Sequence, residues 1–74
     1  MEFRVFAGYM ADESAAFVYA ETEEAAIIAA RAIAKSSECG EAEIECHNGR
    51  GWEIYAVAFR NKVTLWETGE PIIA

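Results

Sequence analysis

The sequence predicts an α+β fold in which one helix packs on one face of an antiparallel sheet of about five strands. Two observations predict it. Stretches whose hydrophobicity alternates with a period of two lie on both sides of a single helical stretch, and turn-forming residues separate them in the order ββαβββ. With 74 residues the chain is expected to form a single domain, residues 1–74, with one layer of core between sheet and helix.

An N-terminal hairpin is the first predicted unit. Apolar residues alternate with other residues over 3–10, which predicts a strand with one face turned to a core. Residues 11–14 read as a turn. A second strand is predicted over about 15–20, with Phe17 and Tyr19 on the same side.

The single helix is predicted to begin after Thr22 and to end near Lys35. The Thr22 hydroxyl is a good N-cap, and Glu23 and Glu24 put negative charge where the helix dipole favours it. Gly40 follows the helix and can take a left-handed conformation. The apolar stripe expected to lie on the sheet consists of Ile28, Ala29, Ala32 and Ile33.

The third and fourth strands are predicted to form a hairpin around Asn48-Gly49-Arg50. A three-residue loop pairs Ile44 with Ile54 on the core face and sets Glu45 opposite Glu53 on the other face. A loop one residue shorter or longer would put Glu53 on the core face, where an unpaired carboxylate is costly. The three-residue loop is therefore expected.

A second turn is predicted at Asn61-Lys62. A two-residue loop there pairs Ala58 with Leu65 on the core face and Val57 with Trp66 on the other face. The apolar tail after residue 71 is expected either to fold back or to fray.

These registers gather carboxylates and aromatic rings on the face away from the helix. A small domain has little reason to expose such a patch unless something docks there. The predicted partner-binding residues are Glu43, Glu45, Glu53, Tyr55, Val57, Phe59 and Trp66. A second copy of the chain, or the C-terminal tail, could instead cover the same face.

The charge balance bears on the choice of partner. Thirteen Asp and Glu against six Lys and Arg give a net charge of −7, which disfavours nucleic acid and anionic membrane and favours a basic protein surface. The alternative is that the charge only maintains solubility. The longest apolar run, Ala25–Ala30, is too short to span a membrane, and Met1–Arg4 does not resemble a signal peptide, so a cytoplasmic protein is expected.

Few residues could support catalysis or hold a metal. His47 could form a dyad with Glu45, but a solvated hairpin histidine is the simpler interpretation. Cys39 and Cys46 are expected to be thiols; their spacing is wider than in zinc sites, and Cys46 points to the core. We expect no enzymatic activity, no metal and no cofactor, since Ser14, Ser36 and Ser37 also lack a nucleophile motif.

The run Val18–Ala26, the alanine-rich helix, Glu38-Cys39-Gly40 and the hairpins at Asn48-Gly49 and Asn61-Lys62 resemble small proteins of phages and mobile elements. The chain looks most like anti-CRISPR inhibitors of type I systems, in size, layout and charge over roughly residues 18–66. The resemblance implies a non-enzymatic inhibitor, in the host cytoplasm, that binds Cas proteins of the CRISPR complex and blocks nucleic-acid access, as a nucleic-acid mimic. The alternative is a homodimeric structural or accessory protein of a phage or mobile element.

Overall fold

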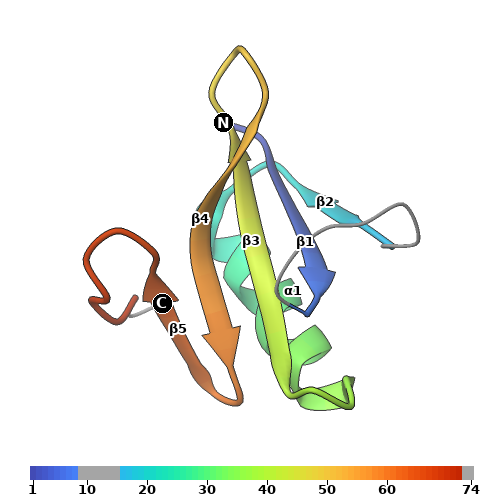
Figure 1. Ribbon diagram of the computed structural model, residues 1–74. Helices are drawn as coiled ribbons and strands as arrows, with labels where there is room; N and C mark the ends of the chain where they lie inside the picture. The colour runs from blue at the N-terminus through green and yellow to red at the C-terminus, as the bar shows by residue number, and fades with distance from the viewer. Residues whose placement is uncertain (9–15, 73–74) are drawn as a thin grey trace.

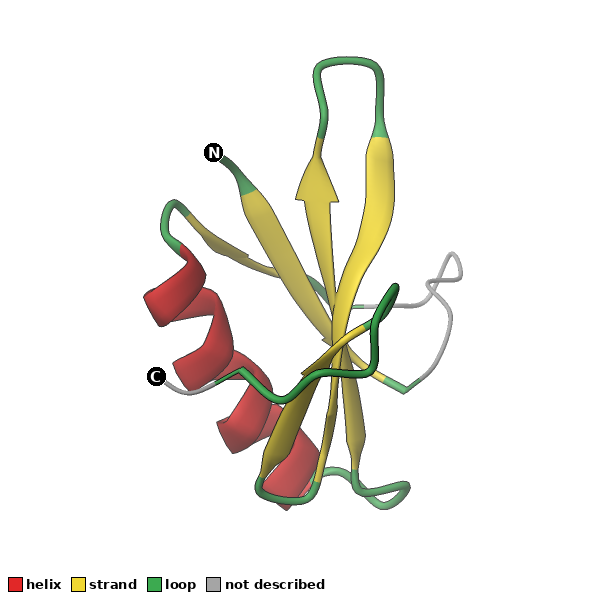
Figure 2. Cartoon of the chain, turned by 90° about the vertical axis from the view of Figure 1, so that its left-hand side faces the viewer, coloured by secondary structure: helices red, strands yellow, loops and turns green. Residues whose placement is uncertain are grey.

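The computed structural model describes residues 1–8 and 16–72, and it contains one helix and a five-stranded antiparallel sheet. The elements along the chain are β1 (Phe3–Ala7), β2 (Val18–Ala20), α1 (Glu23–Ser36), β3 (Glu41–His47), β4 (Trp52–Phe59) and β5 (Lys62–Leu65). The strand order in the sheet is β2-β1-β3-β4-β5 (Figure 1). Helix α1 runs along one face of the sheet (Figure 2), which confirms the predicted fold class and element order.

The N-terminal strands are shorter than predicted. β1 ends at Ala7, and the next residue, Gly8, has a φ of 95° that only glycine adopts without strain. β2 begins at Val18 rather than near residue 15, and the turn predicted over 11–14 lies outside the described residues.

The ends of α1 form as their local chemistry predicts. The Thr22 hydroxyl accepts a hydrogen bond from the amide of Ala25 at 3.1 Å, so the predicted N-cap is confirmed. Lys35 lies in the last turn, where its positive charge interacts favourably with the negative end of the helix dipole.

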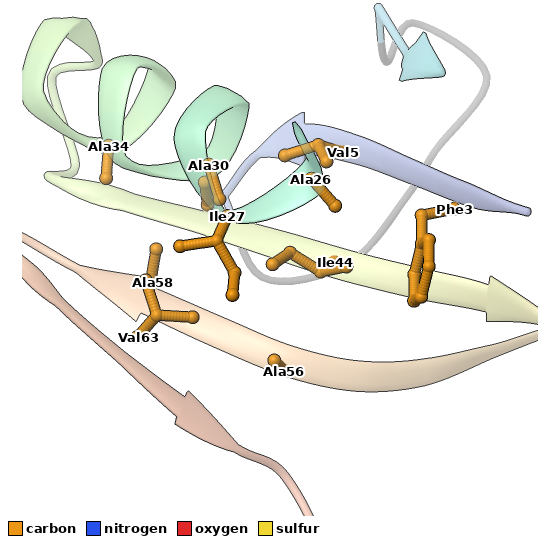
Figure 3. Packing of buried hydrophobic residues seen from close by; sticks show 11 residues of the cluster. Phe3, Val5, Ala26, Ile27, Ala30, Ala34, Ile44, Ala56, Ala58 and Val63 are labelled. Carbon is orange, nitrogen blue, oxygen red and sulfur yellow. The ribbon is translucent and has the colours of Figure 1, made fainter. Parts of the chain in front are cut away.

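The side of α1 that meets the sheet differs from the predicted stripe. Ile27 is fully buried and points between α1 and the strands beneath it, whereas Ile28 is 62% exposed (Figure 3). Ala32 is also exposed, so the predicted stripe is wrong at two of its four positions. The observed stripe follows helical spacing equally well, and small residues on both surfaces let α1 approach the sheet. The buried residues of α1 are Ala26, Ile27, Ala30 and Ala34.

The hairpin between β3 and β4 has a longer loop than predicted. Glu45 pairs with Ile54 and Cys46 pairs with Glu53, so the predicted pairing of Glu45 with Glu53 is wrong. The side chain of Asn48 stabilises the four-residue loop by accepting hydrogen bonds from the amides of Arg50, at 2.8 Å, and Gly51, at 3.1 Å.

A β-bulge compensates for the longer loop. The register shifts between Ile44, which pairs with Ala56, and Glu45, which pairs with Ile54, so that Tyr55 is the extra residue on β4. The bulge therefore reverses which residues of β4 face α1: on its N-terminal side the odd-numbered residue Glu53 faces the helix side, whereas beyond it the even-numbered Ala56 and Ala58 do. Glu53 does fall on the helix side, but it is exposed, because it lies near the end of the sheet beyond the first turn of α1. The burial penalty that argued for a shorter loop is thus absent.

The turn between β4 and β5 consists of Arg60 and Asn61, one residue earlier than predicted. Arg60 adopts the left-handed conformation, with a φ of 58°. Val57 pairs with Thr64 rather than with Trp66, a shift of two residues that leaves the β5 side chains on their predicted faces.

The segment after β5 folds back against the sheet. Pro71 forms a bridge with Thr64, and the amide of Ile72 donates to the carbonyl of Val63 at 2.8 Å. The Ile72 side chain packs against the core. Of the two alternatives for the tail, folding back describes it as far as residue 72.

Candidate partner-binding surfaces

The seven predicted binding residues do not share one surface. Glu43, Glu45, Val57 and Phe59 occupy alternate positions of β3 and β4 on the face away from α1, here called the open face. Glu53 and Tyr55 do not belong to it, because the bulge reverses the alternation of β4 on its N-terminal side. The surface predicted from the sequence is therefore wrong at these two positions.

Tyr55 ties the sheet to the helix. Its ring meets the buried ring of Phe3 edge-on, with centroids 5.3 Å apart, and its hydroxyl donates a hydrogen bond to the carboxylate of Glu23 in the first turn of α1. This hydrogen bond is the main cause that raises the pKa of Tyr55 to about 12, and burial adds to it. Tyr55 thus connects the sheet to α1 and does not belong to the open face.

Glu45 lies on the open face but already has a partner. The Arg4 Nε donates to Glu45 Oε1 at 2.5 Å, and the two residues are cross-strand neighbours. The Arg4 guanidinium also lies 4.3 Å from the ring centre of Phe17 and 4.5 Å from that of Trp52. Sequence reasoning did not identify Arg4, because its place beside Glu45 depends on the pairing of β1 with β3, which are far apart in the chain.

Glu43 is buried rather than presented to solvent. Only 6% of its surface is exposed, and its cross-strand neighbours are Phe6 and Val57. Burial raises the pKa of Glu43 to about 7, and the charge of Glu45 adds to the rise while Arg4 opposes it. The carboxyl therefore keeps its proton to a higher pH than an exposed glutamate does, and it is not an exposed charge for docking.

His47 belongs to an aromatic cluster at the end of the open face where Arg4 contacts Trp52. Its ring meets that of Trp52 edge-on at 5.1 Å, and Trp52 in turn lies 6.1 Å from the ring of Tyr19. The Nδ1 atom of His47 accepts a hydrogen bond from the amide of Gly49. Both members of the predicted dyad thus have other partners: Gly49 for His47 and Arg4 for Glu45.

The remaining three predicted residues do gather on the open face. Val57, Phe59 and Trp66 line a hollow of about 390 Å³ over β4 and β5, here called the β4–β5 hollow. Phe59 is 49% exposed and Trp66 is 51% exposed, which is unusual for rings of this size. Its wall also contains Glu41, Lys62, Thr64, Leu65 and Gly69.

A second hollow of similar size lies at the other end of β4, next to the N-terminus of α1. We call it the amino-end hollow. Its apolar lining includes Met1, Cys46, Tyr55 and Leu65. Its acidic lining residues are Glu53 and Glu67. Burial raises the pKa of the Cys46 thiol, and the nearby carboxylate of Glu53 raises it further, while the α-ammonium group of Met1 opposes the rise.

Residues 1–8 and 16–72 contain neither a metal-binding cluster nor a membrane-spanning helix. No group of three or more His, Cys, Asp or Glu side chains in these ranges could hold a metal ion. No helix formed by them is long and apolar enough to cross a membrane. Comparisons of the chain with protein-family models, curated proteins and solved structures found no match.

Proposed function

We propose that this chain is a non-enzymatic, acidic binding module that docks on a protein partner through the β4–β5 hollow. The observation that carries the proposal is the pair of half-exposed rings, Phe59 and Trp66, beside Val57 on a face that α1 does not cover. Large aromatic residues are the ones that most often anchor protein interfaces.

The partner is a protein with a basic surface. The net charge of −7 favours encounter with such a surface and disfavours nucleic acid. Direct ionic contacts from Glu43 and Glu45 are not part of the proposal, since the first is buried and the second is paired with Arg4. The open face contributes apolar contacts, and the overall charge steers the approach.

The proposed partners are Cas proteins of a type I CRISPR complex, whose nucleic-acid access the chain would block. Size, element order and acidity support this assignment through the resemblance to anti-CRISPR inhibitors. Surfaces that hold a nucleic-acid backbone are basic, so an acidic module of this size suits them.

The test measures binding to a purified type I surveillance complex and the ability of that complex to bind target DNA. The double variant Phe59→Ala/Trp66→Ala should bind at least about tenfold more weakly, because it removes both exposed anchors. Ile28→Ala is the matched control, since it removes exposed apolar surface from the opposite side of the molecule. The proposal fails when the double variant binds like the wild type, or when the wild type leaves DNA binding unchanged.

The alternative occupant of the open face is a second copy of this chain, which would make the protein a homodimeric accessory protein. Sedimentation velocity distinguishes the two. A dimer that Trp66→Ala converts to monomers supports the alternative, whereas a wild-type monomer at micromolar concentration excludes it.

A further inference from the structure

The amino-end hollow exists because α1 does not extend over the whole helix side of the sheet. The helix begins at Glu23, whose carboxylate accepts the hydrogen bond from the Tyr55 hydroxyl. The sheet extends past this end of α1 (Figure 2), where β3 ends at His47 and β4 begins at Trp52. This uncovered end of the sheet forms the floor of the hollow.

The hollow combines an apolar floor with a negative rim. Cys46, Tyr55 and Leu65 contribute the floor, and Glu53 and Glu67 are its carboxylates. Glu53 pairs with Cys46 across the strands, and its exposed side chain lies at the margin of the floor. None of the lining residues is a lysine or an arginine, and the α-ammonium group of Met1 offsets one of the two negative charges, so the lining keeps an excess of negative charge.

We propose that the amino-end hollow receives a lysine or arginine side chain of the protein partner. The inference rests on the proposed function, and it specifies the chemistry of a second contact with the same partner. Long basic side chains have an aliphatic stem that packs on apolar surface and a charged head that seeks carboxylates. The floor fits the stem, and Glu53 and Glu67 bind the head.

The two hollows are close enough for one partner to occupy both. Leu65 lines each of them, and the segment that follows it forms part of both walls. Trp66 and Gly69 face the β4–β5 hollow, while Glu67 and Thr68 line the amino-end hollow. This segment leaves β5 at the edge of the sheet (Figure 1), where a partner can reach it from both sides.

The experiment uses the full chain and a small probe, so that it does not depend on finding the partner. Backbone amide NMR signals are followed during titration with Nα-acetyl-lysine amide and, as a matched probe without the charge, with Nα,Nε-diacetyl-lysine amide. The lysine probe should cause saturable shifts at Cys46, Glu53 and Glu67 that weaken at high salt. The diacetyl probe should cause shifts several-fold smaller at the same concentration.

Paired variants show whether the two carboxylates are responsible. Glu53→Gln/Glu67→Gln should abolish the lysine-specific shifts, whereas Glu38→Gln/Glu70→Gln, which removes the same amount of charge at exposed positions outside the hollow, should keep them. Equal shifts with both probes, or lysine-specific shifts that persist in the first variant, overturn the inference. The binding assay with the surveillance complex measures the contribution of Phe59 and Trp66 instead. A failure of the proposed function would therefore be distinguished from a failure of this inference.

Discussion

The two faces of the sheet are closed in different ways. On the helix side, eleven residues of α1 and the strands are at most 2% exposed and form a continuous apolar core (Figure 3). On the open face, Arg4, Glu45 and Glu43 are largely buried over β1 and β3, but Phe59 and Trp66 remain half exposed over β4 and β5. The difference teaches that the side chains that stabilise this fold and those available for binding are largely separate sets.

Two neighbouring isoleucines of α1 sharpen the comparison most strongly. Ile27→Ala should lower the free energy of unfolding by about 2 to 5 kcal/mol, because it leaves a cavity in a fully buried site. That is a large part of the total of about 5 to 15 kcal/mol typical of small proteins. Ile28→Ala, at an exposed position, should change it by less than about 0.5 kcal/mol. Urea denaturation of both variants checks this, and equal losses would contradict the assigned helix face.

The second prediction concerns the buried carboxyl of the open face. Since the pKa of Glu43 is raised from 4.5 to about 7, the folded state binds its proton more tightly than the unfolded state. The wild type should therefore lose up to about 3 kcal/mol of stability from this group as the pH rises from about 4.5 through 7, and no more above that range.

Glu43→Gln removes this titration and should be more stable than the wild type at pH 8, with little difference at pH 4.5. Denaturation at several pH values measures the difference, and Glu38→Gln is the exposed control. The same pH dependence of stability in wild type and Glu43→Gln would show that the Glu43 carboxyl is not buried in the folded protein.

The third prediction tests the arginine that closes the open face over β1 and β3. Arg4→Met keeps the aliphatic stem but removes the ion pair with Glu45 and the cation–π contacts with Phe17 and Trp52. The expected loss is about 1 to 3 kcal/mol, since the partly buried Glu45 remains without its cation. Adding Glu45→Gln should recover part of the loss in a double-mutant cycle. Strictly additive effects in the cycle would reject the pair as a coupled unit.

The smallest predicted effect lies at the bulge. Tyr55→Phe keeps the ring contact with Phe3 and removes the hydrogen bond to Glu23, at a cost of about 1 kcal/mol. Tyr19→Phe, at an exposed ring, should change stability little. Spectrophotometric titration adds an independent readout, because Tyr55 should ionise at about pH 12. Indistinguishable stabilities for the two variants would argue that Tyr55 is free of α1.

The parts of the fold that depend on neighbours in the chain could be predicted from the sequence. The N-cap at Thr22 and the alternation of the strands require only local chemistry. The bulge at Tyr55 could not be predicted in this way, because it depends on the length of the loop between β3 and β4, and the sequence allows more than one length. The Asn48 side chain favours the longer loop, and with the bulge Ile44 pairs with Ala56 on the core face rather than with the predicted Ile54.

The faces of the candidate site residues were predicted correctly where the observed strand register differs from the predicted one by an even number of residues, because the side chains then stay on the same face. Val57 and Phe59 lie on the expected face because the β3–β4 register on their side of the bulge differs from the predicted one by two residues, with Ile44 paired with Ala56 rather than Ile54. Glu53 and Tyr55 moved to the other side because a bulge changes parity by one. The burial of Glu43 and the ion pair of Glu45 were not predicted, because both depend on β1, which brings Phe6 and Arg4 beside them from a distant part of the chain.

The central claim, that the open face over β4 and β5 is the docking surface, is tested most directly by NMR mapping of the wild-type chain with a purified type I surveillance complex. The account predicts that the signals of Val57, Phe59 and Trp66 broaden or shift at substoichiometric complex, while those of Ile28 and Lys35 on α1 do not change. Broadening confined to α1, with the open face unaffected, would contradict it.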